Sequence, residues 1–76
     1  MTLQEYCKYY RMFILKMTLK ELVERVKEET GEEVSISSVS SFENSRSTNM
    51  KYILYYLSVA NDEQLDFFTD NLKQIL

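Results

Sequence analysis

The side chains best suited to polar recognition gather in one segment, Val34 to Thr48. This segment holds seven serines and one threonine, together with Asn44 and Arg46. Hydroxyl and amide groups donate and accept hydrogen bonds, and a guanidinium group binds phosphate in a planar fork. Such groups suit contact with a polar or anionic surface, such as a nucleic acid. The alternative is a turn-rich connector, because serine is also common in loops.

The residue types that catalysis needs are scarce. The chain has no histidine and a single cysteine, Cys7, which excludes an internal disulfide and a Cys/His zinc cluster and removes the commonest general base. Cys7 falls on an apolar helical stripe, so we expect it in the core. The other members of that stripe are Leu3, Tyr6, Tyr10, Phe13 and Ile14. No carboxylate pair or glycine-rich phosphate loop stands out. We therefore expect no enzymatic activity, no metal and no cofactor.

No part of the sequence is suited to crossing a membrane. The longest apolar run is six residues, Tyr52 to Leu57, whereas a membrane span needs about 18 or more. The first residues also lack the basic-then-apolar pattern of a secretion signal. We expect a cytoplasmic protein with no membrane partner.

Helical periodicity and N-cap signatures predict the elements that position the serine-rich segment. Three signatures of Thr or Asn followed three residues later by Glu or Gln each predict a helix start: Thr2/Glu5, Thr18/Glu21 and Asn61/Gln64. The predicted helices cover about 3–15, 19 to near Gly31, 36–44, an apolar stretch after a polar loop at 45–49, and about 62–75. The expected core comprises Leu22, Val26, Val39, Phe42, Ile53 and Leu57. Glu43 is expected to pair with an arginine, Arg11 or Arg25.

Two blocks of this sequence resemble the Cro and phage-repressor family of helix-turn-helix proteins, also called XRE. They are Thr18 to Val23, and the block in which Val34-Ser35, Val39 and Phe42-Glu43-Asn44-Ser45-Arg46 stand in the family's places. The resemblance covers about residues 3–60. It implies an all-α, five-helix, lambda-repressor-like helix-turn-helix domain, which we assign to residues 1–76, and a phage or mobile-element regulator that binds double-stranded DNA.

In that family the third helix enters the major groove and the second crosses the phosphate backbone. Carried onto this sequence, Asn44 and Arg46 match backbone-gripping positions, and Lys20 can place a charge near a phosphate at the start of helix two. The full set expected at the DNA is Lys20, Ser35, Ile36, Ser37, Ser38, Ser40, Ser41, Asn44 and Arg46. Arg46 could equally be a solvated surface charge.

The sequence departs from the family pattern at three places. The connection between helices two and three is extended by about six residues, Lys27 to Glu33, which either lengthen helix two or form an acidic loop. Ser45 replaces the family's usual glycine, and Val23 its usual small residue. The base-reading positions Ile36, Ser37 and Ser41 carry no Arg, Asn or Gln, so bidentate base recognition from them is excluded.

The net charge of −3 is localised rather than uniform. The stretches Lys27 to Val34 and 61–76 each have a balance of −3, so the rest of the chain has a balance of +3. A mildly basic surface is therefore compatible with the acidic total.

Six tyrosines and four phenylalanines exceed what one small core can hide, and tyrosine is favoured at protein interfaces. We expect a homodimer through helix five, about 62–75, with helix four contributing. The residues expected at its interface are Tyr52, Tyr56, Phe67, Phe68, Leu72 and Ile75. The alternative is a monomer with a few half-exposed tyrosines.

The function expected from these observations is a small transcriptional regulator, such as a repressor, that binds operator DNA as a dimer through helix three. A two-fold dimer would place its recognition helices about 34 Å apart. The alternative is a helix-turn-helix scaffold that binds another protein as an inhibitor or antirepressor, as the acidic total and the lack of base-reading side chains suggest.

Overall fold

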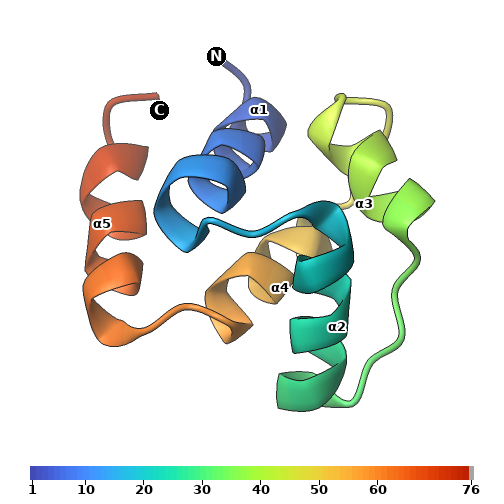
Figure 1. The fold of residues 1–76 in the computed structure, drawn as a ribbon. Helices are drawn as coiled ribbons and strands as arrows, with labels where there is room; N and C mark the ends of the chain where they lie inside the picture. Colours follow the sequence, from blue (N-terminus) through green and yellow to red (C-terminus); the bar gives the residue numbers. More distant parts are fainter. Residues whose placement is uncertain (76) are drawn as a thin grey trace.

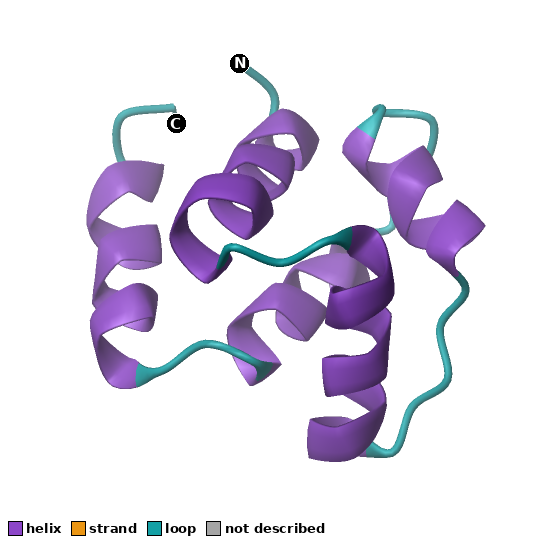
Figure 2. Cartoon of the chain, viewed as in Figure 1, coloured by secondary structure: helices purple, strands orange, loops and turns teal. Residues whose placement is uncertain are grey.

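The computed structural model describes residues 1–75, and within them every regular element is helical (Figures 1 and 2). The elements are α1 (Leu3–Tyr9), the π-helix η1 (Tyr10–Leu15), α2 (Leu19–Thr30), α3 (Ile36–Glu43), the 3₁₀ turn η2 (Met50–Tyr52), α4 (Ile53–Ser58) and α5 (Asp62–Leu72). The expected all-α architecture of five helices is confirmed. No helix in this part of the chain is long and apolar enough to cross a bilayer.

The three predicted N-caps are present as reciprocal capping boxes. Thr2 caps α1, Thr18 caps α2 and Asn61 caps α5, each accepting a hydrogen bond from the amide three residues on. In each case the side chain at that third position bonds back to the cap amide. Because the signature depends only on residues within one turn, local sequence was sufficient to predict these helix starts.

The first helix differs from the prediction in its second half. Residues 3–15 are helical, but Tyr10 to Leu15 form a π-helix that ends at Lys16 in the left-handed conformation, with φ of 56°. The wider turn brings Tyr10 and Leu15, five residues apart, to the same buried side. Phe13, which we placed on the apolar stripe, is instead 61% exposed. The prediction for Phe13 was wrong because it assumed the three-and-four spacing of an α-helix throughout residues 3–15.

The core lies between the helices, with α4 behind α2 and below the first helix in Figure 1. Its fully buried side chains include Tyr10, Tyr56, Phe42 and Leu22. Val26 and Val39 are also buried as predicted, whereas Ile53 and Leu57 are only partly buried against the core. Tyr6 and Tyr10 pack against Phe68 of α5, with ring centroids 5.0 and 4.9 Å from it. This aromatic contact attaches α5 to the first helix.

The extended connection between α2 and α3 is ordered. Helix α2 continues to Thr30 and ends at Gly31, which has a left-handed φ of 78°. Residues 31–35 then run back beside α2 before α3 begins (Figure 1). The two expectations for the insertion are thus both partly met, since it lengthens α2 and also forms a loop. The path places α3 alongside α2 and at one side of the molecule.

Candidate nucleic-acid interface

The inner face of α3 is fixed by apolar packing. Val39 is 1% exposed and Phe42 is 0% exposed. The Phe42 ring meets Tyr52 edge-on at 5.3 Å between centroids and lies 6.3 Å from the ring of Tyr56. Serine has poor intrinsic helix propensity, so these contacts supply the stability that the α3 sequence lacks.

A buried ion pair anchors the last turn of α3. Arg11 donates to both carboxylate oxygens of Glu43, at 2.8 and 2.9 Å, and also to the Met17 carbonyl at 2.8 Å. The Tyr56 hydroxyl donates to Glu43 at 2.8 Å. Burial and the neighbouring carboxylate raise the pKa of Tyr56, so its hydroxyl remains a donor. The expected arginine partner of Glu43 is therefore Arg11, whereas Arg25 bonds Glu29 at 3.1 Å.

Both ends of α3 are capped by residues within the serine-rich segment. Ser35 is the N-cap and accepts from the Ser38 amide at 3.1 Å. At the other end Ser45 has a left-handed φ of 60°. Its amide bonds the Phe42 carbonyl at 3.0 Å, and the Arg46 amide bonds the Ser41 carbonyl at 2.9 Å. This pair of bonds is a Schellman motif, so the segment is a terminated helix rather than a loose connector.

The outer face of α3 carries most of the predicted DNA-contacting residues. Residues three and four apart share a helix face, so Ser37, Ser40, Ser41 and Asn44 lie together, with Ile36 beside them. Ile36 is 44% exposed, Ser37 and Asn44 are exposed, and Ser40 and Ser41 are half-buried. The structure brings these five residues onto one surface.

Several polar atoms on α3 are already used within the helix. The Ser35 hydroxyl donates to the Ser38 hydroxyl at 2.7 Å, so both belong to the N-cap. The Asn44 amide nitrogen donates to the Ser40 carbonyl at 2.9 Å and lies 3.4 Å from the Ser40 hydroxyl. A phosphate group accepts hydrogen bonds, so it binds to donors. With its amide nitrogen engaged by Ser40, Asn44 offers mainly its side-chain oxygen, which is an acceptor. The Ser40 hydroxyl accepts from Asn44 and keeps its own proton, and the Ser37 hydroxyl lies 3.3 Å from that of Ser35. The candidate donors toward DNA are therefore the hydroxyls of Ser37, Ser40 and Ser41.

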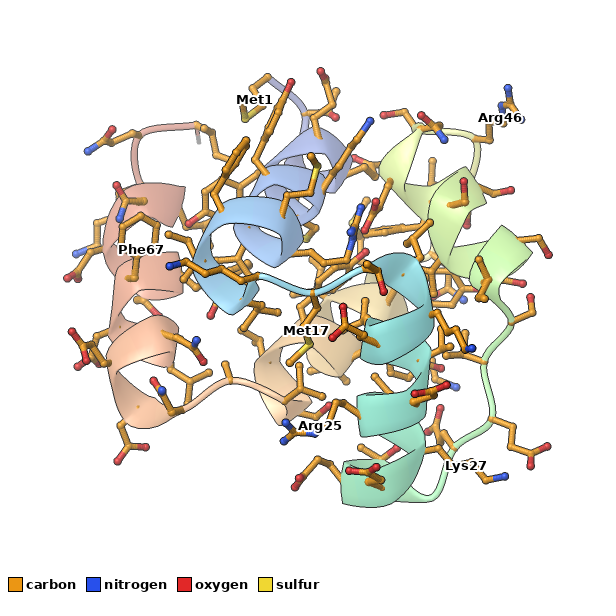
Figure 3. All side chains as sticks on the ribbon, in the orientation of Figure 1. Met1, Met17, Arg25, Lys27, Arg46 and Phe67 are labelled. Atoms are coloured by element: carbon orange, nitrogen blue, oxygen red, sulfur yellow. The ribbon has the colours of Figure 1, made fainter. Side chains whose placement is uncertain are left out.

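Two cations lie beside this surface. Arg46 is exposed and points away from the body of the molecule beyond the end of α3 (Figure 3). Lys20 is exposed in the first turn of α2, the helix that packs against α3. Both side chains are exposed, as phosphate contact requires.

The acidic residues of the connection are engaged by neighbours. Tyr55 donates to Glu32 at 2.6 Å, and Lys27 pairs with Glu33 at 2.8 Å. The hydrogen bond to Glu32 is the main cause that raises the pKa of Tyr55 to about 12, with burial second. The lysine in turn lowers the pKa of Glu33. The Tyr55 bond ties Glu32 to α4, and Lys27 offsets the charge of Glu33.

Two of the six residues predicted at the dimer interface are buried in the core. Tyr56 is 0% exposed and Phe68 is 4% exposed, so both are core residues and are removed from the expected interface. Tyr56 is held by Glu43, and Phe68 is covered by Tyr6 and Tyr10. Tyr52, Leu72 and Ile75 are half-buried, and α5 ends at Leu72 rather than near 75. Phe67 is the one member that is exposed, at 43%.

Cys7 is a core residue, as expected, with no exposed surface. Burial, with a smaller contribution from Glu43, raises the pKa of its thiol to about 12. A buried thiol with a raised pKa is a poor nucleophile.

The chain was compared with family models, curated proteins and solved structures, and none of the three comparisons gives a significant match.

Proposed function

We propose that the protein is a small DNA-binding regulator that contacts the major groove through the outer face of α3. The observation that carries the proposal is the construction of α3. Its inner face is buried, its last turn is tied to Arg11 through Glu43, both ends are capped, and its outer face is polar. A rigid helix with an exposed polar face can enter a groove about 12 Å wide without first having to order itself.

Readout of the bases by this helix would be weak. Ile36 suits a thymine methyl group, and the Ser37 and Ser41 hydroxyls can bond any base edge. Each contact should therefore discriminate by about 1 kcal/mol, the low end of the range for groove contacts. Arg46 and Lys20 would contribute phosphate contacts that position the protein and carry no sequence information. Two copies on successive half-sites would multiply this modest selectivity.

The proposal is tested by fluorescence anisotropy with a labelled random duplex and with promoter fragments from the native host at low salt. We expect binding at micromolar protein, in the range of non-specific association or tighter. The variant Arg46→Gln should weaken binding to all sequences and lower the salt slope by about one. Lys73→Gln, which also removes one exposed positive charge but lies after α5, is the matched control and should change little.

Absence of binding to every duplex at micromolar protein would refute the proposal. Equal losses of DNA affinity in Arg46→Gln and Lys73→Gln would show that DNA is attracted by positive charge alone and not by the α3 surface.

A second candidate function is inhibition of another regulator or DNA-acting enzyme by protein binding. It is favoured by the lack of Arg or Gln on the exposed face of α3 and by the engagement of the Asn44 amide within the helix. Ser41→Glu and Arg46→Glu should abolish activity in cells if DNA is the target. They should leave activity intact if the functional contact lies elsewhere on the protein.

A further inference from the structure

An apolar groove lies between the first helix and α5, on a part of the molecule that the proposed DNA contact does not use. Its volume is about 200 Å³, and its lining residues are Tyr6, Tyr9, Tyr10, Phe13, Ile14 and Phe67. The rings of Tyr9 and Phe13 stack with centroids 6.0 Å apart and form one wall. Phe67 lies on the α5 side (Figure 3). None of the six lining residues is charged.

The aromatic wall of the groove is exposed because residues 10–15 form a π-helix. The wider turn directs Tyr10 and Leu15 into the core and leaves Phe13, which lies between them, on the surface. Phe13 is 61% exposed, Tyr9 44% and Phe67 43%. Adjacent large apolar side chains on the surface of a small domain mark an interaction site, whereas scattered ones do not.

A second hollow adjoins the groove on the same surface. Its volume is about 300 Å³, and it shares Phe13, Ile14 and Phe67 with the groove. Small-molecule sites bury most of their ligand, which walls as exposed as these would not do. Two adjoining hollows instead suit two large side chains about one turn apart on a helix, as when an amphipathic helix docks in a groove.

The α5 edge of this surface is acidic. Glu63 lines the second hollow, and Asp70 follows Phe67 by three residues, on the same helix face. Both carboxylate side chains are exposed. Helix α5 contains no lysine or arginine, and Lys73 comes after its last residue as the C-cap. A partner that covers the aromatic side chains therefore meets negative charge along α5.

The cations of the first helix line other hollows. Lys8 lines one between α1 and the end of α3, where Glu5 lies beside it. Lys16 lines another, with Met17 and Thr18 at the start of α2. The acidic edge of the groove therefore has no matching basic edge among the residues that line it, and its complement has to come from a partner.

We infer that this surface binds an amphipathic helix of another protein, whose apolar side chains fill the two hollows and whose Lys or Arg side chains lie over Glu63 and Asp70. A second copy of the chain fits less well, because it would bring an acidic α5 of its own to the surface. The inference does not depend on the proposed function. No residue of α3 lines either hollow, and α3 and α5 lie at opposite sides of the molecule (Figure 1).

Two synthetic helical peptides of about 18 residues test the inference. Both carry leucine and phenylalanine at i, i+4 and i+7 on an alanine background, and the positions beside this stripe are lysine in one peptide and glutamate in the other. Each peptide is titrated into the ¹⁵N-labelled full chain. We expect the lysine peptide to bind with a Kd of about 10–100 μM and to shift the amides of residues 9–14 and 63–70. The glutamate peptide should bind at least about tenfold more weakly.

A pair of apolar variants tests the aromatic contact. Phe67→Ala should weaken binding of the lysine peptide about thirtyfold, as expected for a central aromatic side chain of an interface. The matched control is Leu54→Ala on α4, which alters a side chain that is 62% exposed and lines neither hollow, and it should change the affinity little. Far-UV circular dichroism verifies that each variant is folded.

A pair of charge variants tests the acidic edge. Glu63→Lys/Asp70→Lys should reverse the preference, so that the glutamate peptide binds more tightly than the lysine peptide. The double variant Glu24→Lys/Glu28→Lys changes the net charge by the same amount at two exposed positions of α2, and it should leave the preference for lysine in place.

Several results would overturn the inference. They are no binding of the lysine peptide at millimolar concentration, equal binding of the two peptides, or an affinity that Phe67→Ala leaves unchanged. Sedimentation equilibrium of the peptide-free chain adds another, because a dimer that Phe67→Ala disrupts would show that a second copy occupies the groove. These outcomes are separate from failure of the proposed function, which is absence of DNA binding by the wild-type chain.

Discussion

The substitution Glu43→Leu should strongly destabilise the fold, because it leaves a buried charge without its partner. The Arg11 and Glu43 side chains are 8% and 3% exposed. Removing one member of a buried ion pair costs about 3–5 kcal/mol. A chain of 76 residues has a total stability of about 4–11 kcal/mol, so the variant should lose about a quarter or more of its free energy of unfolding.

The arrangement around the pair also predicts how the loss can be recovered. Replacing Arg11 as well, in Arg11→Met/Glu43→Leu, removes the unpaired charge and should restore most of the stability. The Tyr56 hydroxyl would still lack its acceptor, which costs about 1–3 kcal/mol, and adding Tyr56→Phe should recover that part.

Urea unfolding followed by circular dichroism measures the free energy of unfolding of each variant. The comparison requires that the variants and the wild type have the same dependence of this free energy on urea concentration. A Glu43→Leu variant within about 0.5 kcal/mol of wild type, the range usual for surface substitutions, would refute the reasoning. So would a double variant no more stable than Glu43→Leu alone.

Three further predictions follow from the connection and the core. Gly31→Ala should lower the free energy of unfolding by about 1 kcal/mol, because alanine is strained at the positive φ of 78°. An added Cβ would meet nothing within 4 Å, so no steric clash adds to this cost. The Tm should fall by about 4–8 °C for Gly31→Ala and by less for Gly31→Asn. Tyr55→Phe removes the 2.6 Å bond to Glu32 and should speed hydrogen exchange of the amides at 32–34 about fivefold, with little change for the α5 amides; unchanged exchange would show that this bond does not hold the connection. Cys7 should resist alkylation in the native state. Folding raises the pKa of the Cys7 thiol to about 12, from about 8.5 in the unfolded chain. The contribution of Cys7 to stability is therefore present below about pH 8.5 and is lost as the pH rises towards 12. A urea midpoint that is unchanged across that pH range would contradict this pH dependence.

The sequence was sufficient for features set by a few adjacent residues. The capping boxes, the end of α2 near Gly31 and the span of α3 all depend on side chains within one or two turns. The path of residues 31–35 was harder to predict, because Glu32 accepts a hydrogen bond from Tyr55, which lies 23 residues further along the chain. The local sequence pattern predicted that a connection is present, but the path of that connection depends on tertiary contacts.

The aromatic residues mark the limit of prediction from pattern. Tyr56 and Phe68 belong to the core and Phe13 to the surface, the reverse of their expected places. The π-helix is responsible for Phe13, and nothing in the spacing of apolar residues distinguishes it from an α-helix. For Tyr56 the decisive factor is a hydrogen bond to a residue thirteen positions away, which gives its hydroxyl a partner inside the core.

The most direct test of the central claim is a titration of the ¹⁵N-labelled protein with a random DNA duplex at low salt, followed by backbone amide chemical shifts. The account predicts that the shifts change mainly at residues 35–46 and near Lys20 in the first turn of α2, while the amides of α5 change little. Absence of any shift change at saturating duplex, or changes centred on α1 and α5 with α3 unaffected, would contradict it.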